Sequence, residues 1–398
     1  MNPELFFTKN TKAALKNDPP GEWMPPVPDY CIPLSAGYPA QSLVPYNEMN
    51  EAVCALIDEE KNLPFQYLGS KRVNTVKKFV RERLVERGVV LLEKEILVTA
   101  GAIQGIDLIA RTFIDRDTLV VVESPSYMEG LEVFRNYTDH FITVPIDENG
   151  MQTEELEKTL KDRKEKNLPM PKLVYTIPSF HNPTGTTMSI DRRRHLLELA
   201  SEYNFLIIED DAYGELYFEE RPTPIKAMDS GSRVLYLGSF SKTIAPGLRV
   251  GYVAARSDLI EPLAWFKKDL DHPFAEATLG SYLIQTDMKK RFEMLRKVYQ
   301  QNCKTIISSL EKYMGEIATW QQPSGGYFVW VNIPGINTSE ILVEAMQAGV
   351  SYVPGKHFFV HEQEGLSYLR LSFSFVSREE MVSAVEILSQ VVKKHLNK

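Results

Sequence analysis

One stretch near the middle of the chain carries residue types suited to covalent chemistry with an aldehyde. In Ser239-Phe-Ser-Lys-Thr-Ile-Ala-Pro-Gly-Leu-Arg249, two serines precede Lys242 and an arginine follows it by seven residues. A lysine amine forms a Schiff base with an aldehyde, and hydroxyl and guanidinium groups bind phosphate. We predict that Ser239, Ser241 and Arg249 hold the phosphate of a cofactor whose aldehyde reacts with this lysine. An isolated Ser-x-Ser-Lys would favour a surface lysine, so partners elsewhere in the chain must support the prediction.

Short apolar runs predict the elements that position this lysine. These runs are rich in β-branched and aromatic residues and lie at 119–123, 172–177, 205–209 and 234–237. Helical patterns separate them, and Ser189 is placed to cap one of these helices. Continuously apolar strands between helices predict an α/β fold whose mainly parallel sheet is covered on both faces.

Changes in composition and sequence pattern along the chain predict an arm and two domains. The first 30 residues are polar and proline-bearing and read as an extended arm, so residues 1–45 are assigned to an arm and part of a small domain. Residues 46–288 are predicted to form a large cofactor-binding domain, and residues 289–398 a smaller α/β domain. Three adjacent arginines, 192–194, are expected on a solvated helix face.

Bulk composition excludes several classes of protein. The chain has 398 residues, 43% hydrophobic and 25% charged, which is typical of a globular protein with two or three domains. Its 45 basic and 53 acidic residues disfavour a basic surface for nucleic acid. No signal peptide or membrane span is visible. Three scattered cysteines show neither a disulfide framework nor metal-ligand spacing. We expect a cytoplasmic protein without metal, membrane or nucleic-acid partners.

The lysine stretch resembles the cofactor loop of fold-type-I pyridoxal 5′-phosphate (PLP) enzymes, especially the class I and II aminotransferases. Asn182-Pro-Thr-Gly185 resembles the N-P-x-G motif of the family, and Asp210-Asp-Ala-Tyr213 resembles its D-x-A-Y motif. The resemblance covers residues 30 to 385 approximately and looks most like the 2-aminoadipate and kynurenine aminotransferases. It implies a large domain with a mainly parallel sheet between helices, a smaller α/β domain, PLP as cofactor and a homodimer.

The resemblance implies a role for each residue near the cofactor ring. Lys242 would be the Schiff-base lysine and proton shuttle, and Asp210 would partner the pyridine nitrogen, with Asp211 as a rival by proximity. Asn182 and Tyr213 would hydrogen-bond to the phenolic oxygen. Tyr127, in Glu-Ser-Pro-Ser-Tyr, would stack on the ring.

Further positions would hold the phosphate. Gly101, Ala102 and Ile103 follow a strand-like run and open a helical pattern, and backbone N–H groups at a helix start favour an anion. Ala102 and Ile103 are apolar where the family carries polar side chains, so contact there would be through the backbone, with possible help from Gln104. Tyr67 would reach the phosphate of the neighbouring subunit's cofactor.

The substrate would meet residues from both ends of the chain. Arg370, in Leu-Arg-Leu-Ser, matches the arginine that binds the α-carboxylate in the family, and a planar guanidinium suits a carboxylate. Asn182 would lie beside it. Gly37 and Tyr38 resemble the segment that closes over the substrate, with Tyr38 facing the side-chain pocket.

These residues predict an aminotransferase that moves an amino group between an L-amino acid and a 2-oxo acid by a ping-pong route. Two alternatives use the same site: a PLP lyase, and a PLP-binding domain of a transcription regulator without turnover. Such regulators carry a winged-helix domain ahead of this region, and the short arm predicted here leaves no room for one. Acidic, aromatic and branched-chain donors all remain open.

Overall fold

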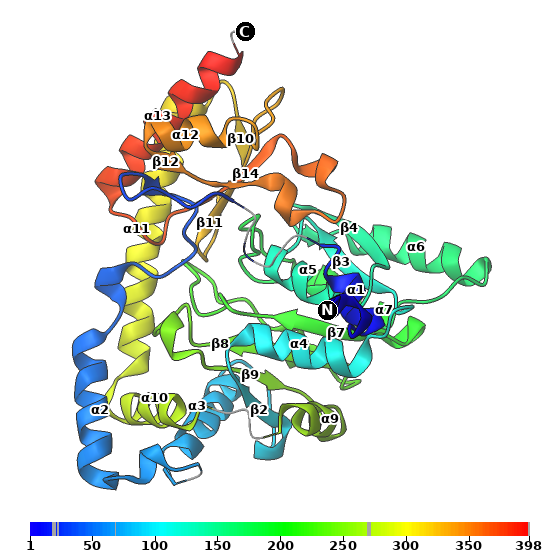
Figure 1. Cartoon of the computed structure of the whole chain (residues 1–398), viewed down its shortest axis with the longest axis vertical. Coiled ribbons are helices and arrows are strands. Elements are labelled where there is room, and N and C mark those ends of the chain that lie inside the picture. Colours follow the sequence, from blue (N-terminus) through cyan, green and yellow to red (C-terminus); the bar gives the residue numbers. More distant parts are fainter. Residues whose placement is uncertain (18–20, 22–23, 68, 269–271, 397–398) are drawn as a thin grey trace.

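An eight-stranded sheet forms the centre of the computed structural model, which describes residues 1–17, 21, 24–67, 69–268 and 272–396 (Figure 1). The strands follow one another across the sheet in the order β2 (Ile96–Thr99), β9 (Gly251–Ala254), β8 (Val234–Ser239), β7 (Leu206–Asp210), β6 (Leu173–Thr176), β3 (Val120–Ser124), β4 (Phe141–Asp147) and β5 (Gly150–Met151). The five strands from β8 to β4 are parallel, whereas β9 is antiparallel to both neighbours and β5 is antiparallel to β4. The predicted mainly parallel sheet is confirmed.

Helices cover both faces of this sheet because alternate strand residues point to opposite sides. In β3, Val120 and Val122 pack with Ile106 on the face covered by α4 (Ala102–Phe113), α5 (Met128–Arg135) and α9 (Ser257–Lys267). Val121 packs with Leu196 on the other face, under α6 (Thr153–Glu165) and α7 (Ile190–Tyr203). Four further helices belong to the part of the chain that contains this sheet: α2 (Tyr46–Glu60), α3 (Val73–Val85), α8 (Ile225–Met228) and α10 (Pro273–Gln285).

Helix α7 begins as predicted but buries one of its three adjacent arginines. The Ser189 hydroxyl accepts a hydrogen bond from the Arg192 backbone N–H, which confirms the predicted cap. The expectation of a solvated arginine face is wrong for Arg193, which is 1% exposed. Arg193 lies three residues before Leu196, on the buried stripe of the helix, and donates to the Pro178, Met188 and Thr223 carbonyls. These bonds satisfy a guanidinium that the core would otherwise exclude.

A second sheet of four antiparallel strands lies at the other end of the molecule. Its order is β10 (Thr319–Trp320), β11 (Phe328–Asn332), β14 (Tyr368–Ser372) and β13 (Val353–Pro354). The helices α11 (Met288–Met314), α12 (Leu342–Ala348) and α13 (Arg378–Leu396) accompany it, and Figure 1 shows α11 running along the side of the molecule. Among the helices that the structure describes, none is long and apolar enough to cross a bilayer.

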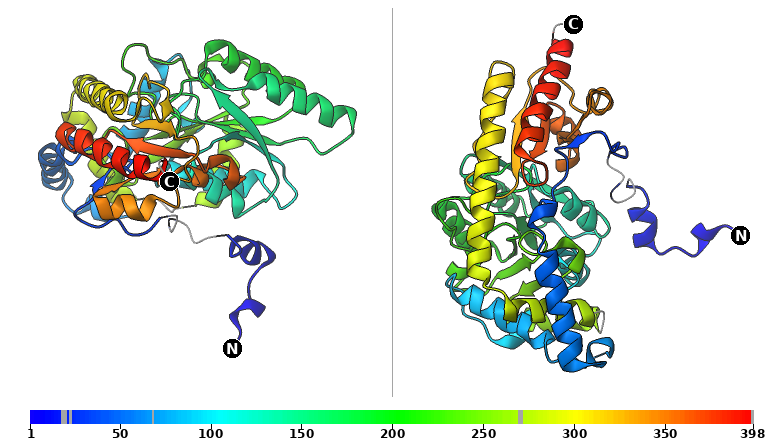
Figure 2. Two further views of the ribbon diagram at one scale, coloured as in Figure 1. Left: turned by 90° about the horizontal axis from the view of Figure 1, so that it is seen from above. Right: turned by 90° about the vertical axis from the view of Figure 1, so that its left-hand side faces the viewer.

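The N-terminal segment joins this second region. Strand β1 (Ile32–Pro33) pairs in parallel with β12 (Val350–Ser351), so residues just after the arm lie beside the C-terminal third of the chain. The arm itself stands away from the body in Figure 2. It is not wholly extended, because Thr8 caps a short helix, α1 (Lys9–Ala14), none of whose residues is buried. Residues 18–20, 22 and 23 of the predicted arm lie outside the described residues.

Candidate active site

A cavity of about 240 Å³ lies at the carboxyl ends of the parallel strands, where open α/β sheets bind their ligands. Both sheets and the segment after β1 contribute to it. Most of the predicted site residues line it: Gly37, Tyr38, Ala102, Ile103, Tyr127, Asn182, Asp210, Tyr213, Ser239, Ser241, Lys242, Arg249 and Arg370. A larger cavity of about 520 Å³, around Pro125, Thr186 and Trp330, contains none of them.

Lys242 follows strand β8 and is half-buried in the cavity. Its Nζ donates a hydrogen bond to the Gly37 carbonyl at 2.9 Å, and the Tyr327 hydroxyl donates to the Lys242 carbonyl at 2.7 Å. Burial lowers the pKa of Lys242 to about 8, although the charge of Glu129 opposes this shift. The amine therefore loses its proton more readily than an ordinary lysine, which makes it a better nucleophile and base near neutral pH.

Asp210 ends strand β7 with a carboxylate that is only half satisfied. The Tyr175 hydroxyl donates to its Oδ2 at 3.0 Å, whereas its Oδ1 is buried without a hydrogen-bond partner among the described residues. Burial raises the pKa of Asp210 to about 6, and the charge of Asp211 adds to this shift. A protonated ring nitrogen at Oδ1 would supply both the missing donor and the missing positive charge.

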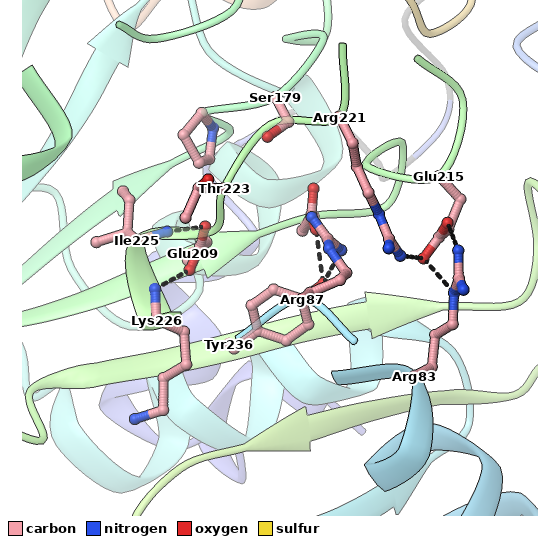
Figure 3. A network of polar contacts seen from close by, with 12 residues as sticks. Arg83, Arg87, Ser179, Glu209, Glu215, Arg221, Thr223, Ile225, Lys226 and Tyr236 are labelled. Carbon is pink, nitrogen blue, oxygen red and sulfur yellow. Dashed lines mark hydrogen bonds and ion pairs between the residues drawn. The ribbon is translucent and has the colours of Figure 1, made fainter. Parts of the chain in front are cut away.

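Asp211, the rival for this role, is engaged elsewhere. It forms an ion pair with Arg87 and accepts a hydrogen bond from the Tyr236 hydroxyl at 2.6 Å. Figure 3 shows Arg87 and Tyr236 in a buried polar network that also contains Glu209, which accepts hydrogen bonds from the backbone N–H groups of Ile225 and Lys226. Because neighbouring residues of a strand point to opposite faces, only Asp210 reaches the cavity.

Replacing Arg87 with Met is expected to lower the free energy of unfolding by about 3–5 kcal/mol, because the buried Asp211 carboxylate would lose its counter-charge. Denaturant titration measures this loss. Arg116→Met is the control, since it breaks a more exposed ion pair with Asp139 and should cost less than about 1 kcal/mol. Similar losses in the two variants would contradict a neutralising role for Arg87.

The predicted phosphate end is built around a glycine. Gly101 has φ +81° and directly precedes α4, and a Cβ atom there would lie 2.7 Å from Nη2 of Arg249. No side chain caps α4, so the N–H groups of Ala102 and Ile103 are available to an anion. The close approach of Arg249 thus requires glycine and brings a guanidinium to this helix start.

Polar side chains at this end have different partners. The Ser239 hydroxyl accepts a hydrogen bond from the Ser241 backbone N–H at 3.1 Å, and both serines line the cavity. Gln104 does not line the cavity, and its Oε1 accepts a hydrogen bond from the Ala100 N–H at 2.7 Å. This bond leaves the N–H groups of Ala102 and Ile103 available, and both serines lie at the same cavity.

Arg370 of β14 is buried and bridges two distant segments. Its Nη1 donates to Asn182 Oδ1 at 3.0 Å and its Nη2 to the Ser35 carbonyl at 2.9 Å, while its Nε has no partner among the described residues. The Phe328 ring lies 4.2 Å from the guanidinium carbon. Burial lowers the pKa of Arg370 to about 10, so it is charged at neutral pH. Its bond to Oδ1 also leaves the amide nitrogen of Asn182 to act as a donor.

The cavity walls are aromatic. Tyr213 is 4% exposed, lies edge-on to Phe328, and has its pKa raised by burial. The Tyr127 hydroxyl donates to the Glu129 carboxylate. Tyr38 is 57% exposed, next to Gly37, where a Cβ would come within 3.0 Å of Phe328. These residues offer flat surfaces for a ring and little space beside residue 37.

Tyr67 is the one predicted residue that lies far from this cavity. It is 90% exposed and lines a separate hollow with Phe65 and Phe274, whose rings stack at 5.4 Å. Its predicted contact with the cofactor of a neighbouring subunit stays a prediction.

Several residues of the site were not predicted from the sequence. Glu129, Phe328 and Ser35 line the cavity, and Tyr175 holds Asp210. Phe328 was visible only as part of the apolar run Gly-Gly-Tyr-Phe-Val. Tyr175 could have been found from strand alternation, since it pairs with the residue two before Asp210 on the neighbouring strand.

The residues present fit PLP. The unpartnered Asp210 Oδ1 suits a pyridinium, the free N–H groups at α4 with Arg249 suit a phosphate, and Lys242 suits the aldehyde. Among the described residues, no group of histidine, cysteine, aspartate or glutamate side chains is arranged to hold a metal ion.

Comparison with known proteins agrees with this geometry. The model of the aminotransferase class I and II family matches residues 32–388. An aromatic-amino-acid aminotransferase of Thermococcus litoralis is 36% identical over 92% of this chain and 89% of its own length. The multiple substrate aminotransferase of Thermococcus profundus superposes with a TM-score of 0.89 at 32% identity, with both chains fully covered.

Two further comparisons bear on the cofactor and on the alternative reading. The kynurenine aminotransferase of Pyrococcus horikoshii, solved with PMP and kynurenine, has a TM-score of 0.87 at 32% identity over 99% of this chain and 98% of its own. Other relatives are named as HTH-type transcriptional regulators of Bacillus subtilis and Staphylococcus aureus. The chain belongs to the class I and II aminotransferases, fold-type-I enzymes that depend on PLP.

Proposed function

We propose that the protein transfers an amino group between an L-amino acid and a 2-oxo acid in a ping-pong reaction centred on Lys242. The observation that carries this proposal is the convergence of Lys242, Asp210 and Arg370 on one small cavity. PLP supplies the electron sink when it is bound. The chain's own residues attach it, orient the substrate and move the proton.

Cofactor binding is assigned to three groups of residues. Asp210 would hold the ring nitrogen protonated through its unpartnered Oδ1, and Tyr127 would cover the ring. Asn182 and Tyr213 would donate to the phenolic oxygen. The phosphate would rest on the α4 start, at Gly101, Ala102 and Ile103, and on the side chains of Ser239, Ser241 and Arg249, which line the cavity.

Substrate orientation and proton transfer are assigned to Arg370 and Lys242. Arg370 would bind the α-carboxylate, exchanging its bond to the Ser35 carbonyl for one to the substrate. With its pKa lowered to about 8, the Lys242 amine would be the base that takes a proton from the substrate Cα and the acid that gives it back on the other side of the C–N bond, where PLP would supply the accepting carbon. Gly37 and Tyr38 would close the cavity over the substrate.

Spectroscopic titration tests this function. Purified holoenzyme would be mixed with a panel of amino acids while the visible absorption of the cofactor is recorded. We expect stoichiometric conversion to the aminated form, reversed by a 2-oxo acid. No conversion with any amino acid would favour a regulator-like domain that holds PLP without turnover. Release of ammonia or a shortened carbon skeleton, without reversal, would favour a lyase.

The assembly and location of the protein are also proposals. A homodimer is supported by the exposed aromatic side chains of Phe65, Tyr67 and Phe274, which a second copy would cover. Sedimentation as a monomer at micromolar concentration would contradict it. Free cysteines at 31, 54 and 303 fit the cytoplasm. We also propose domain boundaries near residues 45 and 288.

A further inference from the structure

The charges of the cavity leave one carboxylate unassigned. Five charged side chains among the described residues line it: Glu129, Asp210, Lys242, Arg249 and Arg370. In the proposed function, each of the last four meets a group of the cofactor or the substrate α-carboxylate. Glu129 has no assigned contact with the cofactor or with the substrate α-carboxylate.

Glu129 lines the cavity beside Tyr127. It stands in the first turn of α5, two residues after Tyr127, and is half-buried. It accepts a hydrogen bond from the Tyr127 hydroxyl and forms no ion pair with the described residues. Its charge raises the pKa of both Lys242 and Arg370, so it acts on the two groups that would hold the reacting end of an amino acid.

Among the described residues of this chain, the cavity offers no cation besides Lys242, Arg249 and Arg370. The remaining lining near Arg370 is uncharged and mostly aromatic or apolar: Ser35, Tyr38, Met128, Ile177 and Phe328. A substrate whose side chain ends in a carboxylate would place a second negative charge in a small, partly desolvated space beside Glu129. Like charges in such a space repel far more strongly than in water.

We propose that Glu129 is a specificity-determining residue that disfavours substrates with an acidic side chain and leaves neutral side chains as the preferred class. The inference rests on the proposed function, because it assumes that the amino acid lies between Lys242 and Arg370. Donor and acceptor share one cavity in a ping-pong reaction, so 2-oxo acids with a second carboxylate are disfavoured in the same way as acidic donors.

Two isosteric substrates test this charge effect. Glutamate and glutamine have the same size and differ by one charge, as do the Glu129 side chain and its replacement in Glu129→Gln. We expect the wild-type enzyme to use glutamine better than glutamate in kcat/KM. Glu129→Gln should raise kcat/KM for glutamate about tenfold and change that for glutamine less than about threefold. The proposal would be overturned if the ratio of kcat/KM for glutamate to kcat/KM for glutamine in Glu129→Gln stayed within twofold of the wild-type ratio.

Tyr127→Phe separates charge from position. This variant removes the hydroxyl that Glu129 binds but keeps the carboxylate, whereas Glu129→Gln keeps an acceptor for that hydroxyl and removes the charge. Whatever its effect on the overall rate, Tyr127→Phe should leave the glutamate-to-glutamine ratio unchanged. An equal shift of the ratio in both variants would mean that Glu129 acts only by positioning Tyr127 and would overturn the charge effect.

Binding of unreactive acids distinguishes this proposal from the proposed function. Calorimetric titration of holoenzyme with glutarate and with pentanoate gives dissociation constants without turnover. Glu129→Gln should tighten glutarate about tenfold and leave pentanoate unchanged. Catalysis with an unshifted selectivity overturns the role of Glu129 alone. Selective tightening of glutarate in a protein that aminates no substrate supports Glu129 and overturns the aminotransferase function instead.

Discussion

Lys242→Ala is expected to lower kcat for transamination at least about 10⁴-fold, because one amine both attaches the cofactor and moves the Cα proton. The structure supports both roles, since the Lys242 amine has its pKa lowered to about 8 in a half-buried position. Steady-state rates with a reactive amino acid would measure the loss. Borohydride reduction followed by peptide mass spectrometry should find the cofactor fixed to Lys242 in the wild type and unattached in the variant.

Two controls accompany this experiment. Lys78→Ala, at a lysine whose side chain is 68% exposed, should keep full activity and full trapping. Addition of a small primary amine to Lys242→Ala should restore part of the rate if only the base is missing. Trapping of the cofactor at the wild-type level in Lys242→Ala would show that another lysine carries it.

Asp210→Asn is expected to lower kcat by about 10²- to 10³-fold while leaving the fold intact. An amide has nearly the same shape but cannot balance a protonated ring nitrogen, so the electron sink would weaken. The buried, unpartnered Oδ1 of Asp210 is the atom that loses its charge. Single-turnover spectroscopy would locate the loss in proton removal, and cofactor affinity should fall as well.

Asp211→Asn is the matched control because the two aspartates are adjacent. Asp211 neutralises the buried Arg87, so its replacement should lower the free energy of unfolding by about 3–5 kcal/mol. The negative charge of Asp210, unlike that of Asp211, destabilises the cofactor-free protein. Its pKa is raised from about 4 to about 6, so its contribution to stability is complete at low pH and is lost as the pH rises through 6.

Cofactor-free Asp210→Asn should therefore be at least as stable as the cofactor-free wild type at pH 8. A large loss of stability in Asp210→Asn with unchanged catalysis would reverse the assignments of the two aspartates.

The strand ends could be predicted because their signals are local. Each parallel strand is a short apolar run, and the residues that follow it must meet at one edge of the sheet. This pattern, together with the resemblance to the motifs of the family, predicted that Asp210, Lys242 and Asn182 belong to one site. The start of α7 at Ser189 depends on a single hydroxyl and was equally visible.

The features that could not be predicted share a cause: they depend on what faces a residue in the folded protein and not on its neighbours in the chain. Arg193 looked solvated beside two other arginines, yet the helix turns it into the core, where three carbonyls receive it. Glu129 looks like an ordinary acidic residue of a first helical turn. Only the structure shows that Glu129 lines the candidate active site, and the ion pair with Arg87 shows why Asp211 does not.

The hydrogen bonds of Arg370 and Lys242 also bear on how the correctly folded fraction of a preparation can be measured. Arg370 reaches Asn182 and Ser35, and Lys242 reaches Gly37, so the complete site needs three stretches that lie far apart in the sequence. A chain with its N-terminal segment or second sheet misplaced would keep the side chains assigned to the cofactor but would lose Gly37 or Arg370 from the cavity. The fraction of bound cofactor that an amino acid converts would therefore measure the fraction of correctly assembled molecules in a preparation.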